Sequence, residues 1–296
     1  MLYRSFLLLV TLGNLGLAQQ EQGFPPVKES DVRHIDALRT SGPIRIDGKL
    51  DEQDWKRAPE SPRFVDLISG HETIHDTRVR LLWDDDNLYV GYTVQEPDVK
   101  ATFTKRDSPI YQENDVEFFI AGEDAYYEFE INALGTIYEG LFAWQDSYIS
   151  SGIASLPQLD RTRDDVRCQA FNGVGLKSHP RGLRWAFLDW DYPGAFQAVK
   201  IHGTLNDSTD HDLGWTVELS FPWKGLSVLN MSQPRTLPPR AGDVWRMDFS
   251  RFNQYKSLDP SAGQQDSGGW ALSHHGIWDS HIPECFPFVT LRDNQD

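Results

Sequence analysis

The chain has 296 residues, of which 39% are apolar and 12% aromatic, so it holds ample material for a sizeable core. Its 28 Lys and Arg against 44 Asp and Glu give a formal net charge of −16. This charge repels phosphate backbones and anionic lipid surfaces, which argues against binding to nucleic acid or to a membrane. The length fits either one large all-β domain or two ordinary domains.

The N-terminus has the pattern of a cleaved signal peptide at residues 1–18. Arg4 precedes a short apolar run at 6–12, and small residues precede the predicted cleavage site. The run is too short to span a bilayer, and no later apolar stretch is long enough. We therefore expect a soluble protein that is secreted or periplasmic, with a flexible polar leader at 19–39 ahead of a single domain at 40–296.

The body of the chain opens with segments whose apolar residues alternate as in strands. We expect a short strand at 44–46, a helical turn that carries Trp55, and strands at 79–83 and 88–94. Three Asp and one Asn at 84–87 are typical of a hairpin turn. A Ca²⁺ site at this turn is the alternative, although the spacing does not match an EF-hand loop.

Residues 112–139 predict a β-hairpin, because two alternating runs flank a short polar turn. One face of the two strands is apolar, and the other carries Asp115, Glu117, Glu128, Glu130 and Asn132. Directly opposed like charges destabilise a sheet, so a nearby Arg or Lys, a bound cation or a ligand rich in hydroxyl groups has to offset them. A polar face that simply lies in solvent is the alternative.

The second half of the chain contains further segments in which apolar and polar residues alternate. Residues 144–183 have weaker periodicity and predict strands interrupted by loops, or a small inserted subdomain. A hairpin at 199–221, with a helical turn after it, and strands at 243–251 and 286–291 follow. Successive strands need a second layer to cover their apolar faces. We therefore predict an all-β fold, an antiparallel β-sandwich of the jelly-roll or immunoglobulin-like kind with long loops.

Cys168 and Cys285 are the only cysteines. In an exported protein such a pair can form a disulfide. The sequence does not give the distance between them, so a disulfide and a pair of free, buried thiols both stay open.

Six motifs occur in an order that is typical of one group of binding modules: residues 46–55, 79–90, 114–120, 126–135, 214–223 and 245–251. Through them the chain resembles carbohydrate-binding family 9 modules and their stand-alone relatives. That family is similar in fold to the DOMON-like sandwiches, some of which bind haem. The resemblance implies a β-sandwich that binds sugar ends in a slot between two aromatic rings above a polar floor, often with structural Ca²⁺ and without a catalytic cofactor.

The resemblance implies two aromatic walls and four floor positions for ligand binding: Tyr111, Trp278, Glu117, Glu130, Asn132 and Asp248. Aromatic faces suit the C–H patches of sugars, and carboxylates and amides suit the hydroxyl groups. Tyr111 stands where the family has Trp, and Glu130 stands where a basic residue can occur. The family's preference for xylan or cellulose is therefore not carried over. Arg246, on the same face as Asp248, is the alternative source of neutralising charge.

We predict a secreted, non-catalytic carbohydrate-binding protein that acts as a monomer on an oligo- or polysaccharide. A glycoside hydrolase is one alternative, with Glu117 and Glu130 as its acid and base on the two sides of a cleft. A haem-binding protein is another, with Met231 or Met247 as an axial ligand. A structural matrix protein without a ligand is the third.

Overall fold

The computed structural model describes residues 23–253 and 266–294, and the predicted signal peptide lies outside them. Within these ranges the secondary structure is almost entirely β, with fourteen strands. The strands are β1 (His34–Arg39), β2 (Val65–Asp66), β3 (Thr77–Trp83), β4 (Asn87–Gln95), β5 (Asp115–Ala121), β6 (Ala125–Asn132), β7 (Ile137–Trp144), β8 (Cys168–Phe171), β9 (Arg184–Phe187), β10 (Phe196–His202), β11 (Gly214–Pro222), β12 (Val244–Phe252), β13 (Gly269–Ala271) and β14 (Phe288–Arg292).

Helices are short throughout the described ranges. The only α-helix there is α1 (Gln53–Arg57), which confirms the helical turn expected at Trp55. The 3₁₀ turns are η1 (Glu29–Asp31), η2 (Ile110–Gln112), η3 (Ile153–Ser155), η4 (Pro157–Leu159), η5 (Trp223–Asn230) and η7 (Pro283–Cys285). None of the described helices has the length and apolar character that crossing a membrane requires.

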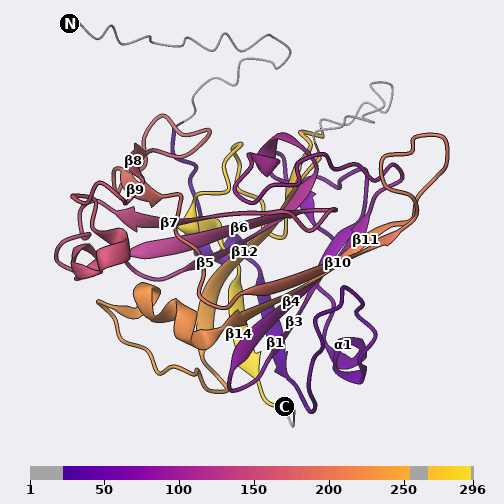
Figure 1. Cartoon of the computed structure of the whole chain (residues 1–296), viewed down its shortest axis with the longest axis horizontal. Helices are drawn as coiled ribbons and strands as arrows, with labels where there is room; N and C mark the ends of the chain where they lie inside the picture. The colour runs from indigo at the N-terminus through magenta and orange to yellow at the C-terminus, as the bar shows by residue number, and fades with distance from the viewer. Residues whose placement is uncertain (1–22, 254–265, 295–296) are drawn as a thin grey trace, which may run out of the picture.

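The strands form one hydrogen-bonded sheet in the order β10-β11-β4-β3-β1-β14-β12-β5-β6-β7-β9-β8, with β13 and β2 attached at β12. The sheet folds over so that its two halves pack face to face (Figure 1). Phe118 on β5 stacks on Phe221 of β11, with ring centroids 4.9 Å apart, and Tyr92 on β4 lies 6.3 Å from Phe249 of β12. The predicted all-β sandwich is therefore confirmed. Its pairing is not purely antiparallel, since β1 runs parallel to both β14 and β3.

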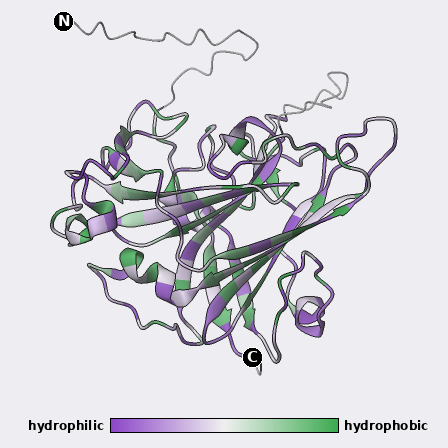
Figure 2. Ribbon diagram, viewed as in Figure 1, coloured by the Kyte–Doolittle hydropathy of each residue, from purple (hydrophilic) through white to green (hydrophobic). Residues whose placement is uncertain are grey.

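The strands of both layers carry hydrophobic residues along their length, interrupted by hydrophilic ones (Figure 2). Val116, Phe118 and Ile120 of β5 are all buried in the core between the layers. The alternate residues of the same hairpin, however, are also buried: every residue of β5 and β6 is below the surface. The polar outer face of this hairpin is thus covered, and the expectation that it could simply lie in solvent is wrong.

Two expectations for the N-terminal part are corrected. Residues 34–39 were assigned to the flexible leader, but they form β1 in the middle of the sheet, where Ala37 is fully buried. Residues 44–46 form no strand. Ile44 and Ile46 instead pack against Trp55, which explains their alternation without a hydrogen-bonded ladder.

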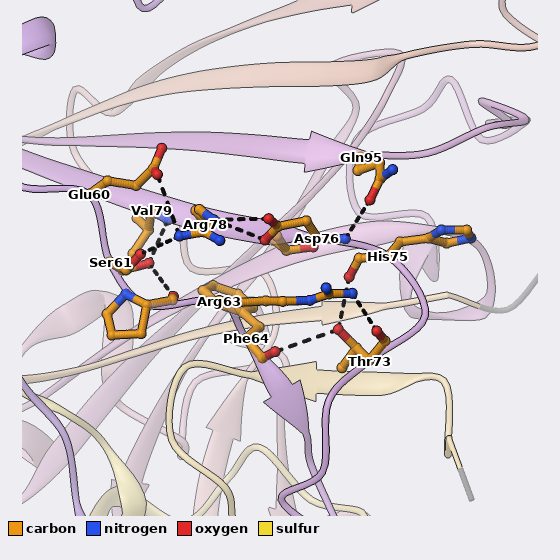
Figure 3. A network of polar contacts seen from close by, with 12 residues as sticks. Glu60, Ser61, Arg63, Phe64, Thr73, His75, Asp76, Arg78, Val79 and Gln95 are labelled. Atoms are coloured by element: carbon orange, nitrogen blue, oxygen red, sulfur yellow. Dashed lines mark hydrogen bonds and ion pairs between the residues drawn. The ribbon is translucent and has the colours of Figure 1, made fainter. Parts of the chain in front are cut away.

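The segment before β3 is held by polar contacts (Figure 3). Arg78 on β3 pairs with Asp76 at 3.0 Å and with Glu60 at 3.5 Å. The Ser61 hydroxyl accepts a hydrogen bond from the Val79 amide at 3.0 Å, and the Gln95 side chain accepts one from the Asp76 amide at 2.8 Å. These contacts fix the connection that leads from α1 to the sheet.

The weakly periodic region 144–183 extends the sheet and does not form a separate subdomain. β8 pairs with β9, and β9 pairs with β7. Cys168 lies on β8 and is partly exposed, whereas Cys285 is buried in η7, and both thiols are free. The disulfide that the sequence left open is therefore not formed.

Candidate functional site

A cavity of about 430 Å³ lies over the outer face of β5, β6 and β7. Its floor contains three carboxyl side chains, and its walls include residues of β8, Leu188 directly after β9 and the loop after β13. The lining residues are Glu117, Glu128, Glu130, Tyr111, Tyr138, Phe142, Phe171, Phe252, Trp278, Arg167, Gln169, Asp279, Ser280, His281, Val174 and Leu188. The cavity is thus an acidic floor with aromatic walls.

Strand register brings the floor residues together. Ser250 on β12 stands opposite Glu117 on β5, Glu117 opposite Glu130 on β6, and Glu130 opposite Tyr138 on β7. Side chains directly opposite on paired strands lie about 4.5–5.5 Å apart at Cβ. Glu128 belongs to the next row of the same face, since residues two apart on a strand share one side of the sheet.

Two aromatic residues that the sequence placed in the site do line the cavity. Tyr111 lies on η2, is 46% exposed, and contacts Tyr138 edge-on at 5.7 Å. Trp278 lies in the loop after β13 and contacts Phe252 edge-on at 4.9 Å. Gly269 permits this position, because a Cβ there would come within 2.6 Å of the Trp278 ring. Both predicted wall residues therefore face the same cavity as Glu117 and Glu130.

Asn132 does not line the cavity. It is fully buried at the end of β6, where its amide group donates to the Phe103 carbonyl at 2.9 Å and to Glu113 at 2.6 Å. Its carbonyl oxygen accepts hydrogen bonds from the amides of Leu134 and Thr136. All of its polar atoms are used by neighbouring loops, so its predicted place on the ligand-binding floor is corrected to a structural one.

Asp248 also lies outside the lining of the cavity. It is fully buried on β12, and its nearest ion-pair partner is His275 at 3.5 Å. Arg246, the predicted neutralising base, is directed elsewhere: its guanidinium donates to the carbonyls of Phe286, Pro283 and Glu284 and lies over the Phe288 ring. It therefore supplies no neutralising positive charge to the acidic floor.

Burial shifts the pKa values of two neighbouring residues that line the cavity, Glu128 and His281. It raises the pKa of Glu128 to about 8, with help from the negative charge of Asp279, and it lowers the pKa of His281 to about 3. His281 Nε2 lies 3.2 Å from Glu128 Oε1, and His281 Nδ1 lies 3.1 Å from the Tyr126 hydroxyl. At neutral pH this pair is therefore an uncharged hydrogen-bonding group in the wall.

The pKa values of the two other floor carboxyl groups, Glu117 and Glu130, and of Asp115 beside them are shifted in the same direction as that of Glu128. Burial, followed by the negative charges of neighbouring carboxylates, raises the pKa values of Asp115, Glu117 and Glu130 well above their ordinary range. Perturbed carboxyl groups that meet in a cavity are typical of functional sites.

Asp279 joins the two loops that close the cavity. Its Oδ2 accepts hydrogen bonds from the amides of Val174 at 2.8 Å and Gly175 at 3.1 Å, and its Oδ1 accepts one from the His281 amide at 2.8 Å. Both loops are far from β5 and β6 in the sequence. One carboxylate thereby fixes the wall that carries Trp278 and His281.

Sequence reasoning missed several lining residues. Glu128 was placed on the polar face of the hairpin by its strand parity, but it was not included among the predicted ligand-binding residues. Tyr138 lies within the predicted range 112–139, but it belongs to β7, a third strand that the sequence analysis did not predict. His281 and Phe171 come from segments without clear periodicity, so no local signal marked them.

The comparisons with known proteins bear on this arrangement. Residues 68–152 match the model of carbohydrate-binding family 9. Over these residues the chain is similar to carbohydrate-binding family 9. The matched residues include Tyr111 and the whole floor on β5, β6 and β7, whereas Trp278 and His281 lie beyond them. No curated protein matches the chain.

The solved structures that are similar to this chain have low sequence identity to it. One is a candidate carbohydrate-binding protein from Bacteroides uniformis ATCC 8492, with a TM-score of 0.56 at 13% identity over 88% of this chain and 100% of that one. Two are structures of a carbohydrate-binding module of family 9 from Caldicellulosiruptor kristjanssonii. The complex with cellotriose has a TM-score of 0.47 at 16% identity over 89% of this chain and 96% of that one. The complex with glucose has a TM-score of 0.46 at 16% identity over 88% and 97%. The first likeness supports the fold.

Proposed function

We propose that this protein is exported and binds carbohydrate in the cavity above β5, β6 and β7, without chemical conversion of the sugar. One observation carries the proposal: Tyr111 and Trp278 line the same cavity as the carboxyl groups of Glu117 and Glu130. The match of residues 68–152 to carbohydrate-binding family 9 supports it. The signal-like segment at 1–18 supports export.

The chemistry of the cavity suits a sugar. The C–H faces of a pyranose are apolar and gain from contact with aromatic rings such as those of Tyr111 and Trp278. Its hydroxyl groups can donate to the carboxyl oxygens of Glu117 and Glu130, and the uncharged Glu128–His281 pair offers further hydrogen bonds. The volume of about 430 Å³ is in the range of small-molecule sites.

The same geometry gives less support to a glycoside hydrolase. Catalytic carboxyl groups flank the scissile bond from two sides. Glu117 and Glu130 are instead cross-strand neighbours on one floor. A haem site finds little support either, because Met247 is buried in the core between the layers.

A glycan array, followed by calorimetric titration of the best oligosaccharide, tests the proposal. We expect Trp278→Ala and Tyr111→Ala each to weaken binding by about tenfold, which corresponds to roughly 1.4 kcal/mol. Phe196→Ala is the matched control, because Phe196 is an aromatic residue that is 61% exposed on β10, outside the cavity lining. Binding that persists unchanged in both cavity variants would contradict the proposed site.

A further inference from the structure

Three buried carboxyl groups meet beside the cavity, and two of them, Glu117 and Glu130, line it. Asp115 and Glu117 lie on β5, and Glu130 is the cross-strand partner of Glu117 on β6. One oxygen from each lies within 4.8 Å of the other two, and the three residues are at most 4% exposed. In the part of the chain that the structure describes, this is the one group of three or more His, Cys, Asp or Glu with ligand atoms so close together.

Two oxygens of this cluster are buried without a hydrogen-bond donor: Asp115 Oδ2 and Glu130 Oε2. The Tyr111 amide donates a hydrogen bond to Glu130, and further hydrogen bonds reach Glu117 and Asp115. The Ser250 hydroxyl donates to Glu117 Oε2 at 2.9 Å, and the Phe252 amide donates to Asp115 Oδ1 at 3.2 Å. A buried carboxyl oxygen without a partner is costly, so its persistence points to a missing electropositive ligand.

The positive side chains nearby are engaged elsewhere. Arg251 feels the charge of Asp115, but it lies on the core side of β12 and pairs with Glu96 at 3.4 Å. Arg167 lines the cavity, and its guanidinium lies 3.3 Å from Asp189. The remaining titratable group beside the cluster is the carboxyl group of Glu128, which supplies no positive charge and, when it is ionised, raises the pKa of Glu117 and Glu130 further. Among the residues that the structure describes, no side chain therefore places a positive charge between the three carboxyl groups.

We propose that Asp115, Glu117 and Glu130 bind a hard divalent cation, with Ca²⁺ as the best match. Glu117 and Glu130 line the cavity, so the cation can enter there and keep open coordination positions toward the bound ligand. The resemblance to the family allows a basic residue at the position of Glu130. This chain has Glu130 at that position, and the proposed cation would take the place of the positive side chain.

The donor set favours Ca²⁺ over other common ions. Ca²⁺ takes six to eight oxygen ligands at about 2.3–2.6 Å, so oxygens on opposite sides of the ion lie about 5 Å apart. The 4.8 Å span of the cluster fits this size. Mg²⁺ needs oxygens at about 2.0–2.1 Å in near-ideal octahedral geometry, which calls for a tighter cluster. Zn²⁺ prefers nitrogen and sulfur donors, and the cluster has none.

Calorimetry without any sugar tests the cation site directly. The protein is stripped with EDTA and titrated separately with CaCl₂, MgCl₂ and MnCl₂. We expect one Ca²⁺ to bind per chain and Glu130→Gln and Asp115→Asn to weaken its binding by at least about tenfold. Ca²⁺ should also raise the melting temperature of the wild type. Glu123→Gln is the matched control, since it removes one acidic charge from the exposed turn of the same hairpin.

Absence of both Ca²⁺ heat and a shift in melting temperature for the wild type would overturn the proposal, as would unchanged Ca²⁺ binding in both variants. If the variants fail to fold, Tb³⁺ luminescence of the wild type decides. Emission excited through the nearby aromatic rings and displaced by Ca²⁺ supports the site, and no such emission overturns it. The test is independent of the proposed function: a protein that binds Ca²⁺ but no saccharide would refute sugar binding and leave the cation site standing.

Discussion

Arg251→Met should lower the free energy of unfolding by about 3–5 kcal/mol, because it leaves a buried carboxylate without its partner. Arg251 is fully buried on the core side of β12 and connects the two layers of the sandwich. Its guanidinium lies 3.4 Å from Glu96 and donates to the Thr77 hydroxyl and the Gln95 carbonyl, each at 2.9 Å. It also lies 4.6 Å above the Trp270 ring.

The size of the expected loss in unfolding free energy depends on the hydrogen-bond donors that remain at Glu96 after the substitution. Burial raises the pKa of Glu96, and the charge of Arg251 opposes that rise. After the substitution, the Trp215 indole still donates to Glu96 at 3.0 Å, and the Asn114 amide also donates to it. These neutral donors compensate only part of the lost positive charge. We therefore expect a loss of unfolding free energy in the range that is typical when one partner of a buried ion pair is removed. For a domain of this size, the melting temperature should fall by roughly 10 °C.

Urea unfolding of four proteins measures this effect: wild type, Arg251→Met, Glu96→Gln and the double variant. Removing both charges should restore part of the loss, since no unpaired ion remains. Arg251→Leu serves as a second apolar replacement with a different shape. A loss below about 1 kcal/mol for Arg251→Met, or additive losses in the double variant, would show that the pair does not join the layers as described.

Three further predictions concern stability and thiol chemistry. Burial lowers the pKa of His75 to about 4, whereas an unfolded histidine titrates near 6.5, so stability should be lost as the pH falls between these values. In urea titrations at pH 7 and pH 4.5, His75→Gln should remove about 1–2 kcal/mol of this acid-induced loss, and an unchanged loss would contradict the assignment. Alkylation followed by mass spectrometry should label Cys168 in the folded protein and Cys285 only after unfolding, because the second thiol is buried; an unlabelled, bridged pair would be the opposite result. Gly214→Ala should cost more than about 1 kcal/mol in thermal unfolding, since Gly214 has φ of +127° and a Cβ there would lie 1.9 Å from the Val94 carbonyl oxygen; wild-type stability would refute this.

The central hairpin was predictable because its signal is local. Strict alternation at 115–121 and 125–132 fixes both the strands and the face to which each side chain points. The predicted wall residue Tyr111 directly precedes this hairpin, and the floor residues Glu117 and Glu130 follow from its parity. These parts of the site needed no knowledge of the rest of the chain.

Other parts depend on contacts between distant segments. β1 has little strand character of its own and forms because it pairs with β14, more than 240 residues away. The walls above the acidic face come from β8, Leu188 and the loop at 278–281, and none of these segments has a clear period. Asn132 has the predicted parity, but Phe103 and Glu113 capture its side chain from a neighbouring loop. Parity therefore identifies a face of the sheet, and tertiary packing decides which of its residues a ligand can reach.

The most direct test of the account is a structure of the protein with the saccharide selected on the glycan array, solved in the presence of Ca²⁺. We expect the sugar ring to lie against Trp278 or Tyr111, with its hydroxyl groups directed at the carboxyl groups on β5 and β6. A saccharide bound on another surface, with the cavity closed by protein side chains, would contradict the account.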